Sequence, residues 1–224
     1  MKKKKLIHIE NVAFSFNGRT LFDRLNLDIF QREIFLLVGK SGSGLTTFLR
    51  LLSGLIKPTE GRVEVFNVDI HNSSQHQLMK VRQRIGFVFQ HSALLNNMTL
   101  LENVALPLRY HMNIKEKDCY DIAREKLRFT GIEEYKNELP AQLSEECLKR
   151  GGLARALALE PELIFCDELT SGLGKYHSNC IFNLIEKLTE EKGITPVIVS
   201  HDSIVDNKLV DKIGVLRNGS IEMN

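Results

Sequence analysis

A short run between two glycines has the residue types and spacing that bind phosphate. It reads VGKSGSGLTTFLR, and Gly39, Gly44 and Thr46 occupy their positions in the pattern G-x-x-x-x-G-K-[ST]. In such a loop, backbone N–H groups surround the phosphates, the lysine neutralises charge and the hydroxyl reaches Mg²⁺. Leu45 stands where the lysine belongs. The run therefore predicts a phosphate-binding loop that lacks its usual positive charge.

Two other apolar runs end in side chains suited to nucleotide chemistry. ELIFCDE ends in Asp167 and Glu168, and TPVIVSHD carries His201 near its end. Ligands bind at the carboxyl ends of strands in open α/β sheets, so we expect these side chains to gather beside the loop. Thr46 and Asp167 would then hold Mg²⁺. Glu168 would activate a water for attack, and His201 would sense the terminal phosphate.

The elements that must position these residues begin with antiparallel β-structure. Residues 6–36 form alternating runs separated by Asn17-Gly18, a strong hairpin signal. Residues 34–39 are continuously apolar, as in a strand buried on both faces. Apolar residues at helical spacing follow the glycine loop. Strand, loop and helix in this order are the context that a phosphate-binding loop requires.

The rest of the chain predicts an α/β fold. RVEVF, RIGFVFQ, ELIFCDE and TPVIVSHD read as strands, and KIGVLRNGSIEM reads as a closing hairpin. Residues 92–160 are mostly helical, with expected breaks at Pro107, Gly131 and Pro140. We expect a P-loop NTPase core with a mostly parallel sheet, an N-terminal antiparallel β subdomain and an inserted helical subdomain. Residues 1–224 would form a single domain.

Composition excludes several classes of protein. Hydrophobic residues make up 43%, charged residues 26%, and the net charge is +2, which is ordinary for a soluble protein and favours no nucleic-acid partner. No apolar run reaches the roughly 18 residues of a membrane helix, and MKKKK precedes no secretory signal, so we expect a cytoplasmic chain. The lysines are either a solvated tail or an attraction to anionic membrane. The four cysteines lack metal-ligand spacing.

Five motifs in order make the whole chain resemble an ABC-transporter ATPase subunit. Besides the glycine loop, these are FSFNGRT with Phe16, VFQ with Gln90, LIFCDE with LTSGLGK behind it, and VIVSHD. The resemblance implies ATP and Mg²⁺ as cofactors and membrane permease subunits as partners. It also implies a homodimer, or a heterodimer with a sister ATPase, on the cytoplasmic face of the inner (cell) membrane.

The resemblance also implies a set of site residues. The catalytic residues would be Glu168, His201 and Gln90, and the metal ligands Thr46, Gln90 and Asp167. Phe16 would stack on adenine. The nucleotide would be bound by Phe16, Gly39, Lys40, Ser41, Gly42, Ser43, Gly44, Leu45, Thr46, Thr47 and Ser144.

Two longer stretches are similar to the Mla/Mce-type ATPases that drive phospholipid transport. They are GFVFQHSALLNNMTLLENVALPLRYH and LPAQLSEECLKRGGLARALALEPELIFCDE. The resemblance implies lipid as the cargo. The apolar part of the first stretch would offer the permease a docking surface, or serve as plain subdomain core.

The family's signature L-S-G-G-x stands here as LSEEC, with Glu145 and Glu146 in place of the glycines. In the family this segment caps the terminal phosphate across a dimer. One like-charge pair at about 4 Å costs on the order of 4 kcal/mol at an effective dielectric near 20. The glutamates would therefore oppose a closed dimer, and Leu45 would present an apolar side chain to the phosphates. Gly174 replaces an aspartate that links the two sites, and Leu169 replaces a proline.

These departures predict an ATP-binding transporter subunit with slow or absent hydrolysis. The alternative is a non-catalytic module that docks a permease or sister ATPase without turnover. A soluble ABC protein acting on nucleic acid is disfavoured by the balanced charge. Lys40 either supplies the missing charge from the second loop position, as in MinD/ArsA-type ATPases, or points to solvent.

Overall fold

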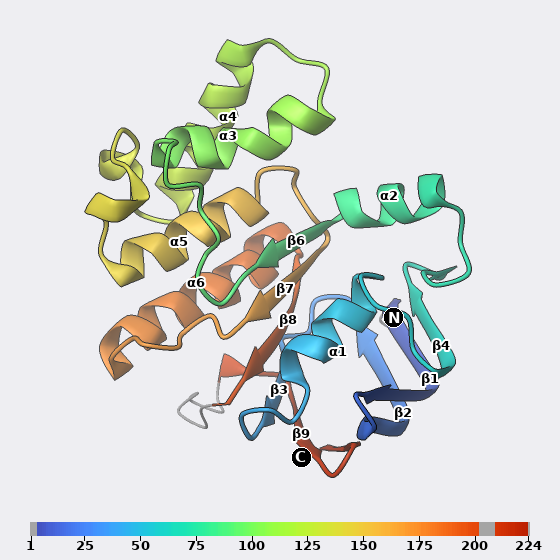
Figure 1. Ribbon diagram of the computed structural model, residues 1–224. Coiled ribbons are helices and arrows are strands. Elements are labelled where there is room, and N and C mark those ends of the chain that lie inside the picture. Colours follow the sequence, from blue (N-terminus) through green and yellow to red (C-terminus); the bar gives the residue numbers. More distant parts are fainter. Residues whose placement is uncertain (1–3, 202–208, 224) are drawn as a thin grey trace.

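The computed structural model describes residues 4–201 and 209–223, which form two β-sheets with helices between and beside them (Figure 1). The antiparallel sheet has the order β2-β1-β4-β5. Its strands are β1 (Lys5–Phe16), β2 (Arg19–Phe30), β4 (Glu60–Val65) and β5 (Val68–Asp69). Asn17 and Gly18 connect β1 to β2 with φ of 49° and 77°, as a type I′ hairpin turn requires. The predicted N-terminal antiparallel sheet is confirmed.

The second sheet has six strands in the order β10-β9-β3-β8-β7-β6. They are β3 (Phe35–Gly39), β6 (Ile85–Val88), β7 (Leu163–Asp167), β8 (Thr195–Ser200), β9 (Lys212–Arg217) and β10 (Ser220–Met223). β3 pairs in parallel with β8 and β9, and β7 pairs in parallel with β8 and β6. Only β10 is antiparallel to its neighbour among the strands described, so the mostly parallel sheet is confirmed. Asp202, at the end of a predicted strand, lies outside the described residues, as do Lys2 and Lys3.

Helix α1 (Leu45–Leu52) lies between the two sheets and joins them through one hydrophobic core. Phe48 and Leu49 pack with β1, β2 and β4 on one side and with β3, β7 and β8 on the other. Helices α5 (Glu145–Ala156) and α6 (Lys175–Lys192) cover the other face of the parallel sheet and form a second core with it. Helix α2 (Gln75–Gln83), which the sequence reading did not single out, precedes β6.

Helices α3 (Leu100–His111) and α4 (Glu116–Phe129) pack with α5 around a third core, away from the antiparallel sheet (Figure 1). Gly131 follows the end of α4, and Pro140 starts a short 3₁₀ turn, as expected for breaks. The break expected at Pro107 is wrong, because this proline lies inside α3. Burial of Val104 and Leu108 holds the helix together despite the hydrogen bond that proline removes. No helix in the described part of the chain is long and apolar enough to cross a membrane.

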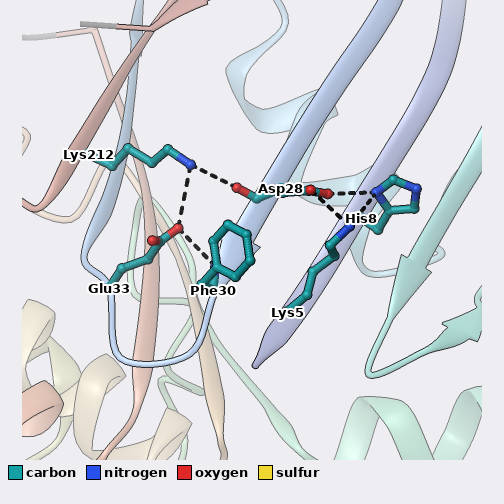
Figure 2. Close-up of polar contacts among 6 residues, drawn as sticks. All are labelled: Lys5, His8, Asp28, Phe30, Glu33 and Lys212. Atoms are coloured by element: carbon teal, nitrogen blue, oxygen red, sulfur yellow. Dashed lines mark hydrogen bonds and ion pairs between the residues drawn. The ribbon is translucent and has the colours of Figure 1, made fainter. Parts of the chain in front are cut away.

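A polar cluster joins the two sheets at the end of β3 opposite the glycine loop (Figure 2). The Asp28 carboxylate lies 2.9 Å from Lys5 Nζ and 2.6 Å from His8 Nδ1. Lys212 Nζ donates to the Asp28 carbonyl at 3.0 Å and lies 3.9 Å from the buried Glu33 carboxylate. Burial opposes ionisation of Asp28, but the hydrogen bonds from Lys5 and His8 outweigh it and lower its pKa. The cluster therefore anchors β9 to the antiparallel sheet, and with it the frame around β3.

Candidate nucleotide-binding site

The strand order places the ends of four parallel strands along one edge of the sheet. Because β3, β8, β7 and β6 are consecutive neighbours, the residues that follow them lie side by side. A cleft of about 290 Å³ opens at this edge. It is lined by Leu21, Lys40, Ser41, Gly42, Gly44, Leu45, Thr46, Thr47, Gln90, Glu168 and His201. Residues predicted from four separate segments are thus brought together.

The N-terminus of α1 forms the floor of this cleft and is open to an anion. Gly44 precedes the helix at φ 110°, in a conformation that side chains disfavour, and provides no side-chain cap. The first turn contains no acidic residue. Its N–H groups and the positive end of the helix dipole are therefore left for a phosphate. Ser43 Oγ is buried without a hydrogen-bond partner among the described residues, which also fits a loop that closes around an anion.

Leu45 does not simply fill the space of a lysine. It lines the cleft, but its side chain is only 7% exposed and belongs to the core between the two sheets. Leu45 thus lines the cleft, while most of its surface packs into the core; that it faces the phosphates stays a prediction. An apolar side chain gains more by turning into the core than by facing the polar cleft. The cleft therefore lacks the lysine's positive charge at this position.

Of three further residues predicted to contact the nucleotide, one lines the cleft and two do not. Lys40 is exposed and lines the cleft. Phe16 is 62% exposed at the end of β1 and is not part of the cleft lining. Ser144 caps α5, where its Oγ accepts the Cys147 N–H at 3.3 Å, and is not part of the lining either. Gly39 and Ser43 form the start and the buried turn of the loop.

Thr46, which lines the cleft, contacts Asp167 at the end of β7. Thr46 Oγ1 donates to Asp167 Oδ1 at 3.1 Å. Burial raises the pKa of Asp167, and the nearby Glu168 carboxylate adds to this, while the Thr46 hydrogen bond opposes it. A divalent cation would relieve the cost of this buried carboxylate. No group of three His, Cys, Asp or Glu side chains among the described residues is arranged to hold a metal ion, so Mg²⁺ here would need phosphate and water among its ligands.

Glu168 and His201 form a second pair beside the first. Glu168 follows β7 with φ of 53°, and its side chain is 8% exposed. Glu168 Oε2 lies 2.8 Å from His201 Nδ1, and Glu168 Oε1 accepts the His201 backbone N–H at 2.9 Å. The left-handed backbone turns the carboxylate from β7 toward the end of β8. With Gln90 in the same lining, the cleft holds a carboxylate, a histidine that pairs with it and an amide side chain.

The acidic signature segment is directed toward its own chain. Glu146 lies 2.7 Å from Arg150 Nη2 and 2.5 Å from His177 Nδ1, which is on α6. Glu145 is exposed and lies against Gly172. Within the chain, Glu146 is therefore paired and Glu145 is exposed, and that the two glutamates oppose a closed dimer stays a prediction. Arg150 and His177 hold the carboxylate of Glu146, whereas Glu145 is more exposed.

Sequence reasoning missed Lys149 and His177. Lys149 is buried on α5 and contacts the Gln90 and Glu168 backbones. Nothing in the pattern singled it out, because a lysine in a helix is usually solvated. His177 was hidden in the same way, three residues inside α6. Only the packing of α5 against β6, β7 and α6 gives these side chains their partners.

Comparison with known proteins identifies the class that this fold and cleft define. The family model "ABC transporter" matches residues 22–171. The match covers more than half of the chain, which therefore belongs to the ABC transporter family as an ATP-binding domain. The chain is similar over 97% of its length to the dimeric ATP-binding cassette MJ0796 in a post-hydrolysis state bound to ADP and Pi, with 34% identity, a TM-score of 0.87 and 97% of that chain covered.

Curated relatives differ in their named cargo. Methionine import ATP-binding protein MetN 1 of Oceanobacillus iheyensis is 36% identical over 223 residues, covering 98% of this chain and 66% of that protein. The intermembrane phospholipid transport ATP-binding protein MlaF of Haemophilus influenzae is 35% identical, covering 89% and 75%. The probable ribonucleotide transport ATP-binding protein mkl of Mycobacterium leprae is 35% identical, covering 94% and 60%. The chain thus spans less than two thirds of the length of several curated relatives.

Proposed function

We propose that the chain is the ATP-binding subunit of a membrane transporter that binds Mg-ATP weakly and hydrolyses it slowly. One observation carries the proposal: in an ABC cassette, one cleft is lined by an uncapped α1 N-terminus, by Thr46, which donates to Asp167, and by the Glu168–His201 pair. Bound Mg²⁺ would supply charge neutralisation at the phosphates, held by Thr46, Asp167 and Gln90. Glu168 would take the proton of an attacking water, and His201 would orient the carboxylate.

Weak binding follows from what the loop lacks. A charge-assisted hydrogen bond contributes about 1.5–3 kcal/mol, and Leu45 provides none. Backbone N–H groups and the helix dipole remain, so affinity is reduced and not abolished. Lys40 is exposed at the rim of the cleft, and we propose that it provides part of the missing charge. Unchanged affinity of Lys40→Ala for an ATP analogue would contradict that assignment.

An apolar groove beside Gln90 supports docking of a permease. The groove of about 240 Å³ lies between β6 and α3 and is lined by Phe87, Phe89, Pro107 and Leu159, with Arg155 at its side. Phe89 is exposed although it is large and apolar. The groove therefore fits an amphipathic helix from a membrane partner, and Gln90 would report its docking to the cleft. This contact would bring the chain to the cytoplasmic face of the membrane.

Lipid is the cargo that we propose, on the support of the MlaF relative and of the two stretches similar to Mla/Mce-type ATPases. The methionine and ribonucleotide relatives match with similar identity, so we propose that the permease, and not this chain, determines the cargo. Purification of the chain with its membrane partner, followed by mass spectrometry of bound small molecules, tests this. Phospholipid is the expected result, and methionine or a nucleoside would contradict it.

A second candidate is an ABC-like pairing subunit that never turns over ATP. The ion pairs of Glu146 with Arg150 and His177 favour this second candidate, because they bind the signature segment to its own chain. Equilibrium binding of a fluorescent ATP analogue, with and without Mg²⁺, separates the two candidates. Magnesium-dependent binding with slow turnover supports the first, and absence of binding supports the second. Turnover by the purified chain alone at about 1 s⁻¹ or faster would contradict both.

A further inference from the structure

Lys149 brings three separate segments of the site together on one buried ammonium group. Its side chain rises from α5 and is 2% exposed. Lys149 Nζ donates to the Gln90 carbonyl oxygen, to the Glu168 carbonyl oxygen at 2.9 Å and to Ser171 Oγ at 3.2 Å. The first acceptor follows β6, the second follows β7, and the third belongs to the turn toward α6, so one ammonium group contacts three segments of the chain.

A buried lysine is costly unless all its donors are used. An ammonium has three donors, and all three are matched here. Burial lowers the pKa of Lys149, while the charges of Glu145, Glu168 and Asp167 favour its protonated form. An apolar residue of similar size would leave the carbonyl oxygens of Gln90 and Glu168 without this shared donor, although Ser171 would still donate to that of Glu168. The arrangement therefore depends on this side chain and not only on the shape of α5.

The same helix holds the Gln90 segment a second time. Arg155 donates to the Ser92 carbonyl at 2.7 Å and to the Ala93 carbonyl at 2.6 Å. Ser92 and Ala93 both have left-handed backbones, with φ of 58° and 49°. Such conformations persist where surrounding contacts enforce them. Residues 90–93 therefore keep their shape through cations of α5, and only Lys149 extends that hold to Glu168.

We propose that Lys149 is a positioning residue that ties the Gln90 segment to the backbone of Glu168, so that movement of one shifts the other. Its role in coupling a docked permease to hydrolysis rests on the proposed function, but the tie itself does not. Residues 90–93 border the apolar groove, and Glu168 lies in the cleft. Through Lys149, a change of conformation at the groove would thus alter the position of Glu168 and of its partner His201.

Hydrogen exchange followed by mass spectrometry on the full chain tests the tie without ligand. In Lys149→Met, exchange at residues 90–93 and at 168–172 should both rise about tenfold, because the two segments lose the donor that they share. The matched control Arg155→Met should raise exchange at 90–93 alone. Lys149→Arg, which keeps the charge and the donors, should restore protection at both segments.

A change at only one segment in Lys149→Met, or an equal rise over the whole chain, would overturn the proposal. If that variant does not fold, Lys149→Gln keeps an N–H donor without the charge, and the same two outcomes decide. A second arm adds an ATP analogue with Mg²⁺. The wild-type chain should gain protection at both segments, and Lys149→Met should keep nucleotide affinity within about threefold but lose the gain at 90–93.

The two hypotheses fail in different ways. If the wild-type chain binds no nucleotide, the proposed function is contradicted, and the exchange pattern without ligand still decides the role of Lys149. If nucleotide protects residues 90–93 equally in the wild-type chain and in Lys149→Met, the tie is overturned while the proposed function stands.

Discussion

The N-termini of α1 and α5 differ in how well they could bind an anion. The α1 terminus has Gly44 before it, no side-chain cap and no acid in its first turn. The α5 terminus is capped by Ser144 and has Glu145 and Glu146 in its first turn. Both helices present the same backbone N–H groups and dipole. The comparison indicates that an anion site needs a helix end whose N–H groups have no partner in their own chain. At α5, the Ser144 cap and the two glutamates already occupy that end.

Adding charge to the open end should produce the largest effect. Leu45→Lys is expected to strengthen binding of Mg-ATP analogue about 10- to 100-fold, since a charge-assisted hydrogen bond is gained. Equilibrium fluorescence titration measures it. Leu45→Met, which keeps the apolar volume, should leave affinity unchanged. Equal affinities for the lysine variant and the wild type would mean that Leu45 is not what limits the site.

Breaking the self-directed contacts of α5 should have the next largest effect. Glu146→Gln removes the charge that pairs with Arg150 and His177 and should lower the free energy of unfolding by about 1–2 kcal/mol. Urea denaturation gives this value. Glu145→Gln is the control and should change stability by less than about 0.5 kcal/mol, because its carboxylate is exposed. Reversed ranking of the two variants would contradict the placement of Glu146.

Removing the cap of α5 sharpens the comparison further. Ser144→Ala loses the acceptor for the Cys147 N–H and should destabilise the chain by about 1 kcal/mol. The melting temperature and urea midpoint should both fall. Thr99→Ala, at the capping box of α3, is a matched case with the same expectation. A Ser144→Ala chain as stable as the wild type would show that this end of α5 is as open as that of α1.

The smallest expected effect on stability concerns Asp167, which lies at the end of β7 and contacts Thr46 in the first turn of α1. Because the pKa of Asp167 is raised in the folded chain, the folded state holds its proton more tightly than the unfolded state. This contribution to stability is fully present below the ordinary pKa of 3.8 and is lost as pH rises through the folded value. Asp167→Asn should abolish it and make the chain slightly more stable at neutral pH. Urea denaturation across that pH range checks the sign.

Much of this cleft could be predicted from patterns along the chain. The apolar runs before Gly39, Asp167 and His201 indicated parallel strands, and such strands end at a common edge. The hairpin at Asn17-Gly18 followed from turn chemistry. Pro107 was misread because a local rule about proline was outweighed by burial in the α3–α5 core. Phe16 was assigned to adenine by resemblance, and it is not among the described residues that line the cleft.

The sequence by itself determined the loop, the strand ends and the absence of a lysine at position 45, because these depend on residue type and on short-range periodicity. Tertiary structure alone decided where Leu45 points, which groups hold Glu146 and what Lys149 contacts. Lys149 and Gln90 are 59 residues apart in the chain. A charge finds such a partner only when packing has removed its water and left one set of acceptors within reach.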